Sequence, residues 1–315
     1  MQFFFEVLIG GLLSGVLYSL VALGFVLIYK ASGVFNFAQG AMVFFAALTF
    51  VGFQEVLPGW LGLETGSAVV FWLAFVLALA SMVVLGLLTE RVVLRPLVNQ
   101  PHITLFMATI GLTFLVEGIA QGIWGANVRG LELGIVDEPI EWLMDRSGIL
   151  VSKFDLFAAA AAGVLVTSLA LFFQYTRIGR ALRAVADDHQ AALSIGIPLQ
   201  HIWGIVWGVA GFVALVAGMI WGARNGVQFA LTFTALKALP VLILGGFTSV
   251  PGAIVGGLII GASEKLAEIY LPPLLQDAFG GNFGGIEGWF PYVLALLFLL
   301  IRPEGLFGEK HIDRV

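Results

Sequence analysis

Long apolar segments dominate this sequence and place the strongest limit on its fold. Runs of about 20 apolar residues, the length at which a helix crosses a bilayer, fall near 5–29, 34–54, 67–90, 103–126, 155–175, 202–223, 230–248, 252–270 and 286–301. Charged residues make up only 11% of the chain, against roughly 25% in a soluble domain. No single soluble core could bury so much apolar surface, so we expect a multi-pass membrane protein.

The runs also predict the fold class. Backbone groups inside a bilayer must be hydrogen-bonded within the protein, and segments of this length satisfy them as helices. We predict an all-α integral membrane protein with about eight to nine transmembrane helices, in which residues 1–315 form one transmembrane domain. The run at 34–54 opens with GVFNFAQG and the run at 230–248 contains ALKALP, so either could be broken or re-entrant.

Lysine and arginine indicate the orientation in the membrane, because cytoplasmic loops carry more of them. If 91–102 lies in the cytoplasm, nine of the 15 basic residues lie on that side and four on the other, with Lys237 and Lys265 inside apolar runs. This predicts an N-terminus outside and a cytoplasmic C-terminus. The polar segment at about 176–201 would be cytoplasmic, and the acidic loop at about 127–154 would be extracytoplasmic.

Several enzyme motifs are absent from the sequence. The chain has no Cys, no phosphate-binding loop G-x-x-x-x-G-K-[ST] and no zinc motif H-E-x-x-H. The nucleophile elbow G-x-S-x-G does not occur either. We therefore expect no catalytic residue, no cofactor and no metal site in this chain, and an intramembrane enzyme is the weakest interpretation.

The segment 176–201, TRIGRALRAVADDHQAALSIGIPLQH, is the most distinctive polar stretch. Gly196 suits a left-handed helix end, and the Ile-Pro that follows it cannot continue a helix. The pattern predicts a short helix followed by a rigid turn. It is either a docking site for a cytoplasmic motor subunit or a basic loop held at anionic lipid headgroups. Three arginines at a spacing of three would form one basic stripe on that helix, before two aspartates break the pattern: Arg177, Arg180, Arg183, Asp187 and Asp188.

Polar residues within the apolar runs form a second set of candidates, because a charge at the bilayer centre costs about 2.5–3.5 kcal/mol. We expect Glu117 to face protein, and Lys237 to extend outward or to pair with Glu117. Glu264 and Lys265 are adjacent and cannot pair with each other on one helix, and either could extend to the interface. Polar and small residues beside helix breaks can expose backbone to a moving solute, or they can simply cap helix ends. The predicted path or gate comprises Asn36, Gln39, Glu117, Lys237, Gly245, Gly246 and Thr248.

Several motifs resemble those of one transporter family. Gln190-Ala191-Ala-x-x-x-Gly, followed by Ile-Pro-Leu, resembles the Glu-Ala-Ala-x-x-x-Gly coupling loop of bacterial ABC importer permeases, with Gln in place of Glu. The segment GVFNFAQG is similar to the Asn-Phe-Ala-His-Gly signature of branched-chain amino acid permeases, with Gln39 in place of His. Residues 237–257 and 301–308 are similar to that family too, and the likeness extends from residue 10 to residue 308. Because Gln stands at both motif positions, no titratable group carries over to them.

The resemblance implies a permease subunit of an ABC importer for branched-chain or related aliphatic amino acids. It would work by alternating access at an interface with a second homologous permease, in the bacterial inner membrane. Two cytoplasmic P-loop ATPases would bind the ATP and magnesium, and a periplasmic or lipid-anchored binding protein would deliver the solute. Relatives for urea, short amides or another small polar solute leave the substrate open, and a secondary transporter or channel without an ATPase is the alternative of another class. The residues implied in ATPase coupling are Arg177, Arg180, Arg183, Asp187, Asp188, Gln190, Ala191 and Gly196.

Overall fold

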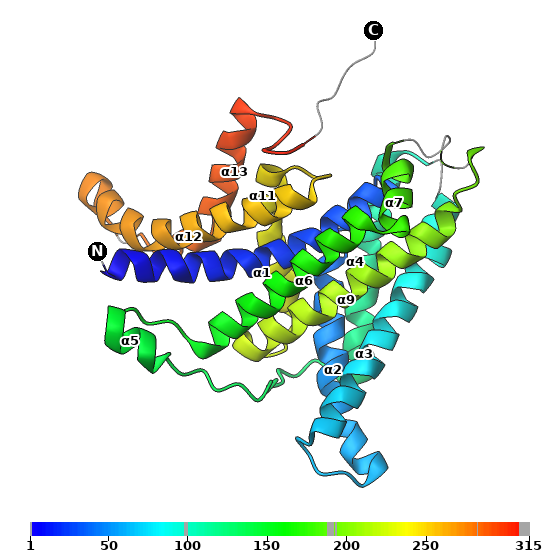
Figure 1. Cartoon of the computed structure of the whole chain (residues 1–315), viewed down its shortest axis with the longest axis horizontal. Coiled ribbons are helices and arrows are strands. Elements are labelled where there is room, and N and C mark those ends of the chain that lie inside the picture. The colour runs from blue at the N-terminus through cyan, green and yellow to red at the C-terminus, as the bar shows by residue number, and fades with distance from the viewer. Residues whose placement is uncertain (1, 98–99, 188–191, 193, 282, 309–315) are drawn as a thin grey trace. The chain divides into compact units, whose positions relative to one another are not determined.

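The computed structural model describes residues 2–97, 100–187, 192, 194–281 and 283–308. Over these residues the regular structure is helical, with two isolated β-bridges, Arg129 to Val227 and Pro139 to Ser152. Seven helical stretches are long and apolar enough to cross a membrane (Figure 1). They are built from α1 (Gln2–Ser32), α2 (Gln39–Leu61), α3 (Ala68–Leu88) with η1 (Thr89–Leu94) and η2 (Arg95–Leu97), α4 (His102–Trp124), α6 (Lys153–Tyr175), α9 (Leu199–Asn225) and α12 (Val250–Phe279).

The remaining helices are short. They are α5 (Glu141–Ser147), α7 (Arg177–Asp187), α10 (Leu231–Thr234), η3 (Ala235–Lys237), α11 (Ala238–Gly245), η4 (Ile286–Gly288) and α13 (Phe290–Ile301). The predicted all-α membrane fold is therefore confirmed.

The two apolar runs that could be broken or re-entrant, 34–54 and 230–248, differ in where their helices are interrupted. In the run at 34–54 the break lies at its start, because α1 ends at Ser32, Gly33 has a φ of 66°, and α2 begins only at Gln39, from which it continues to Leu61. The run at 230–248 is broken as predicted, into α10, η3 and α11. The last run yields only α13, whose 12 residues rise about 18 Å and do not span a hydrocarbon core of about 30 Å.

The chain divides into two compact units. Unit 1 comprises 1–26, 134–170 and 237–315, and unit 2 comprises 27–133 and 171–236. The main chain passes between the units four times, and two of these passages lie within the long helices α1 and α6. A single transmembrane domain over residues 1–315 stays a prediction.

In unit 1, glycines let α1 and α12 pack closely. A Cβ on Gly11 would lie 2.7 Å from the carbonyl oxygen of Gly261, and a Cβ on Gly15 would lie 2.5 Å from that of Gly257. Ser19 extends this contact, because its hydroxyl bonds to the carbonyl of Ile254 at 3.2 Å. A larger side chain would force the two helices apart, which is the role that small residues commonly have between membrane helices.

In unit 2, α2 is the central helix and is buried continuously from Gln39 to Gly52. Helices α3, α4, α9 and α10 pack around it. A Cβ on Gly218 of α9 would lie 2.5 Å from the carbonyl oxygen of Val43, so glycine is required for this contact as well. By contrast, α3 and α4 bury only 22% and 33% of their most apolar stretches, which suits surfaces that meet lipid or another chain.

Candidate functional site

The predicted helix at the start of the polar segment is present as α7. Leu182 and Val185 form its buried apolar side. The three arginines of the predicted stripe are all exposed: Arg177, Arg180 and Arg183. The amphipathic pattern is therefore confirmed, and α7 presents basic groups on its open side.

Two of these arginines also have a structural role that the sequence did not reveal. Arg183 donates from Nη1 to the carbonyl of Phe173 at 2.7 Å and from Nη2 to that of Gln174 at 3.2 Å. Arg180 donates to the carbonyl of Tyr175 at 3.2 Å. These carbonyls lie at the C-terminal end of α6, where carbonyl groups lack partners within the helix. Cations are favourable at such an end. Of the three arginines, only Arg177 has a side chain without a hydrogen bond or ion pair to another described residue.

The turn after α7 agrees with the prediction. Gly196 has a φ of 83°, and the amide of Ile197 donates to the carbonyl of Ala192 at 3.0 Å. Helix α9 starts directly after Pro198. Asp188, Gln190 and Ala191 lie outside the described residues, as does the side chain of Asp187, so their predicted contacts stay predictions.

The amides of the GVFNFAQG segment stabilise the break before α2. Asn36 and Gln39 are fully buried. Asn36 Oδ1 accepts from the amide of Ala38 at 3.2 Å, and its Nδ2 donates to Gln39 Oε1 at 3.3 Å. Gln39 Nε2 is buried without a hydrogen-bond partner among the described residues. In this conformation the pair shapes a helix start, which is the capping alternative considered for these residues.

Helix α4 secures the same break through one hydroxyl. Thr109 Oγ1 accepts from the amide of Phe37 at 3.2 Å and lies 3.1 Å from the carbonyl oxygen of Phe35. Thr109 is fully buried. Sequence reasoning missed this residue, because a lone threonine in an apolar run does not indicate which backbone groups it will meet.

Glu117 faces protein, as predicted, with 6% of its surface exposed. Its carboxyl is directed at the hydroxyl of Thr232, although that hydroxyl forms no hydrogen bond of normal geometry with the described residues. Of the two alternatives for Lys237, the pairing with Glu117 is wrong, because the ammonium of Lys237 binds a different glutamate.

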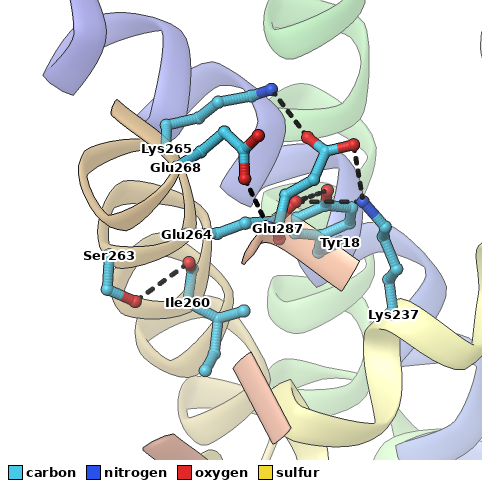
Figure 2. A network of polar contacts seen from close by, with 8 residues as sticks. All are labelled: Tyr18, Lys237, Ile260, Ser263, Glu264, Lys265, Glu268 and Glu287. Carbon is cyan, nitrogen blue, oxygen red and sulfur yellow. Dashed lines mark hydrogen bonds and ion pairs between the residues drawn. The ribbon is translucent and has the colours of Figure 1, made fainter. Parts of the chain in front are cut away.

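That glutamate is Glu264, which is 1% exposed and lies in the middle of α12. Lys237 Nζ lies 3.0 Å from Glu264 Oε1, and the hydroxyl of Tyr18 donates to the same oxygen at 3.0 Å (Figure 2). Glu264 Oε2 is buried without a hydrogen-bond partner among the described residues. The prediction that Glu264 could extend to the membrane–water interface is therefore wrong. Its carboxylate instead connects α1, η3 and α12 within unit 1.

A second layer of charges surrounds this pair in Figure 2. Lys265 Nζ lies 3.2 Å from Glu287 Oε2, and Lys237 Nζ lies 3.9 Å from Glu287 Oε1. Glu268 accepts from the backbone amide of Glu287 at 2.6 Å. Glu264 and Lys265 thus have separate partners, as their adjacency on one helix predicted.

Gly245 and Gly246 form a tightly packed turn at the end of α11. Gly246 has a φ of 102°, and a Cβ there would lie 2.8 Å from the amide nitrogen of Gly308. The amides of Leu306 and Phe307 donate to the carbonyls of Leu244 and Gly245 at 2.8 and 3.1 Å. The two family-like segments, 237–257 and 301–308, therefore bind each other.

The predicted path residues are divided between the two units. Asn36, Gln39 and Glu117 belong to unit 2, whereas Lys237, Gly245, Gly246 and Thr248 belong to unit 1. Thr248 is half-buried between Gly246 and α12. Their role in transport stays a prediction.

Comparison with known proteins identifies the family. Residues 7–301 match the family described as "Branched-chain amino acid transport system / permease component". The chain belongs to this permease family. It is similar to the "High-affinity branched-chain amino acid transport system permease protein LivH" of Escherichia coli, with 26% identity over 99% of this chain and 98% of that protein.

Two further relatives show the range of the likeness. The corresponding permease protein BraD of Pseudomonas aeruginosa is 25% identical over 99% of this chain and 98% of its own. The "Fructose import permease protein FruG" of Bifidobacterium longum is 24% identical over 79% of this chain and 72% of its own. The chain is therefore a multi-pass membrane permease, and its relatives include proteins named for different solutes.

Proposed function

We propose that this permease is the membrane subunit of an ATP-driven ABC importer for branched-chain or related aliphatic amino acids. The supporting observation is the similarity over nearly the whole length to LivH and BraD, which are named for branched-chain amino acid transport. Translocation would occur by alternating access at an interface with a second, homologous permease. FruG, named for fructose import, favours a second candidate, a small polar solute such as urea, an amide or a sugar.

The energy for transport would come from two ATPases in the cytoplasm, which bind ATP and magnesium themselves. A substrate-binding protein would deliver the solute at the outer face of the inner membrane, the N-terminus would lie outside, and the C-terminus would be cytoplasmic. The excess of Lys and Arg on one side of the predicted topology supports this orientation.

Coupling would pass through α7. Its exposed side carries arginines, and two of these are bonded to the last carbonyls of α6. At the far end of the same polar segment, the left-handed turn at Gly196 leads directly into α9. Movement of an ATPase bound to α7 would therefore displace the ends of two membrane helices.

Except for Glu117, which lies within α4, the predicted path residues lie at or near helix interruptions, where transporter backbones rearrange around a solute. Asn36 and Gln39 hold the break before α2, and Gly245 and Gly246 hold the turn after α11. We propose that these two interruptions change between the inward- and outward-open states, together with Glu117, Lys237 and Thr248.

The first experiment is purification of the tagged full-length chain from its native membrane in mild detergent, with mass spectrometry of the bound proteins. The expected result is two P-loop ATPases and a second permease. Recovery of the chain alone, or only with copies of itself, would contradict the proposal and favour a secondary transporter.

The coupling role needs a separate variant. Arg177→Glu reverses a charge without removing the hydrogen bonds of Arg180 and Arg183, and Arg302→Glu is the control because Arg302 is also exposed. We expect Arg177→Glu to lower ATPase recovery about tenfold, equivalent to about 1.4 kcal/mol, with Arg302→Glu unchanged. Normal ATPase recovery and uptake in Arg177→Glu would contradict docking through α7.

A further inference from the structure

Unit 2 contains a pocket that the proposed transport mechanism does not use. It has a volume of about 530 Å³ and lies between the end of α3 with η1 on one side and the start of α9 on the other. This volume is within the roughly 300–1,000 Å³ of ligand sites. Its lining is polar at one end, with Glu90, Arg91, Arg95 and His201, and apolar at the other.

The polar end is organised by the π-helical turn η1. Residues five apart in an α-helix lie roughly 140° apart around the axis, whereas the i to i+5 repeat of a π-helix places them near one face. Glu90 and Arg95 are related in this way, and the amide of Arg95 donates to the carbonyl of Glu90. The Arg95 guanidinium then bonds to both carboxylate oxygens of Glu90 at 3.0–3.1 Å.

This pairing leaves positive charge available in the pocket. Glu90 is 3% exposed and its carboxylate is occupied by Arg95. The side chain of Arg91 is exposed and forms no ion pair with another described residue, and His201 is exposed on the facing helix. Among the described residues that line the pocket, Glu90 is the only acid and it is paired with Arg95, so they leave an excess of positive charge that suits an anion.

The apolar end continues into an exposed strip of α3. Trp72, Val76, Val84 and Leu87 are exposed at spacings of about one or two helical turns, and Arg91 lies one turn beyond Leu87. An apolar strip that ends at an arginine is the order of groups in a phospholipid, from acyl chain to phosphate.

Two glycines of α9 deepen the apolar end. A Cβ on Gly204 would lie 3.2 Å from Leu87 Cδ2, and a Cβ on Gly208 would have no heavy atom within 4 Å. Gly208 therefore leaves open space next to the α3 strip. A side chain at this position would therefore begin in the open space of the pocket.

We propose that this pocket binds one anionic phospholipid. Arg91 and the free edge of the Arg95 guanidinium contact the phosphate, as arginine does in bidentate phosphate recognition, and an acyl chain lies between the α3 strip and Gly208. Basic pockets between membrane helices commonly hold anionic headgroups. A free phosphate would not use the apolar wall, so the lipid accounts for both ends of the pocket. The site is independent of which solute the permease carries.

The test is native mass spectrometry of the full-length chain in detergent, with added phosphatidylglycerol or, separately, phosphatidylcholine. We expect the chain to retain one phosphatidylglycerol in preference to phosphatidylcholine. Arg91→Gln should weaken retention about fivefold, from about 1 kcal/mol per basic residue near a lipid surface, and Gly208→Leu should weaken it by filling the space for the acyl chain. Arg302→Gln and Gly111→Leu are the matched controls, because Arg302 is exposed and a Cβ on Gly111 also meets open space.

Three outcomes would overturn the proposal. Equal retention of the two lipids would show that the positive charge does not select a headgroup. Displacement of phosphatidylglycerol by free glycerol phosphate at low concentration would indicate a site for a soluble anion. Unchanged lipid retention in Arg91→Gln and Gly208→Leu, with loss of a co-purifying protein subunit, would make the pocket a protein docking site.

Discussion

Glu264 of unit 1 and Glu117 of unit 2 are both buried within long apolar α-helices, and their surroundings differ. Glu264 of unit 1 is 1% exposed and meets an ammonium and a phenol hydroxyl, both 3.0 Å away. Glu117 of unit 2 is 6% exposed and faces the hydroxyl of Thr232, with no ion pair among the described residues. A buried carboxylate is tolerated when a cation and hydrogen bonds compensate its lost hydration. Glu264 therefore holds three helical segments together through its partners, whereas Glu117 has no such cationic partner among the described residues.

The interruptions of the two units differ in the same way. The break before α2 in unit 2 is held by an amide pair and a threonine hydroxyl, all neutral. In unit 1 the chain enters α11 at Lys237, whose ammonium is bound to α12. Removal of one group should therefore have a larger effect in unit 1, since it leaves a charge behind.

The largest effect is expected for Lys237→Met, which leaves Glu264 without its cation. Removal of one partner of a buried pair costs roughly 3–5 kcal/mol, and we expect the lower end because the Lys237 side chain is 29% exposed. The thermal unfolding midpoint of the full-length chain in mild detergent measures this loss.

The double variant Lys237→Met with Glu264→Gln is the control, and it should recover most of the lost stability because no charge is left unpaired. Lys265→Met should cost at most about 1 kcal/mol, since Lys265 and Glu287 are both partly exposed. An equal loss in the single and double variants would show that packing, and not the ion pair, carries the contact.

An intermediate effect is expected for Tyr18→Phe. This change removes one hydrogen bond to a charged oxygen of Glu264, which is worth about 1.5–3 kcal/mol. Its cost should shrink in a Glu264→Gln background, a coupling that a double-mutant cycle measures from the unfolding midpoints. Tyr270→Phe, at an exposed position of α12, should have little effect. Full additivity of Tyr18→Phe and Glu264→Gln would disprove the contact.

The smallest effect on stability is expected for Glu117→Gln. The amide keeps the shape of the carboxyl and no ion pair with a described residue is broken, so the loss should stay below about 1 kcal/mol. Solute uptake by the assembled transporter is the second readout. Normal stability with lost uptake would place Glu117 on the transport path. A loss as large as that of Lys237→Met would reveal a cationic partner and remove the contrast between the units.

Much of this molecule could be predicted from short stretches of sequence. Apolar runs predicted the long helices, and Gly196 with Pro198 predicted the turn before α9. Each of these properties depends on residues within a few turns of one helix, where geometry follows from spacing alone.

The partners of individual groups could not be predicted in this way. Lys237 binds Glu264, 27 residues away, and not Glu117, the partner that one of the two predicted alternatives gave it. Arg180 and Arg183 close α6 while lying on the basic side of α7, and the segment at 301–308 binds the turn after α11. The choice depends on which helices are neighbours in three dimensions, because a buried charge or carbonyl binds whichever compatible group packing brings within about 3 Å. Hydrophobic pattern therefore determines where the helices are, and their packing determines which polar groups meet.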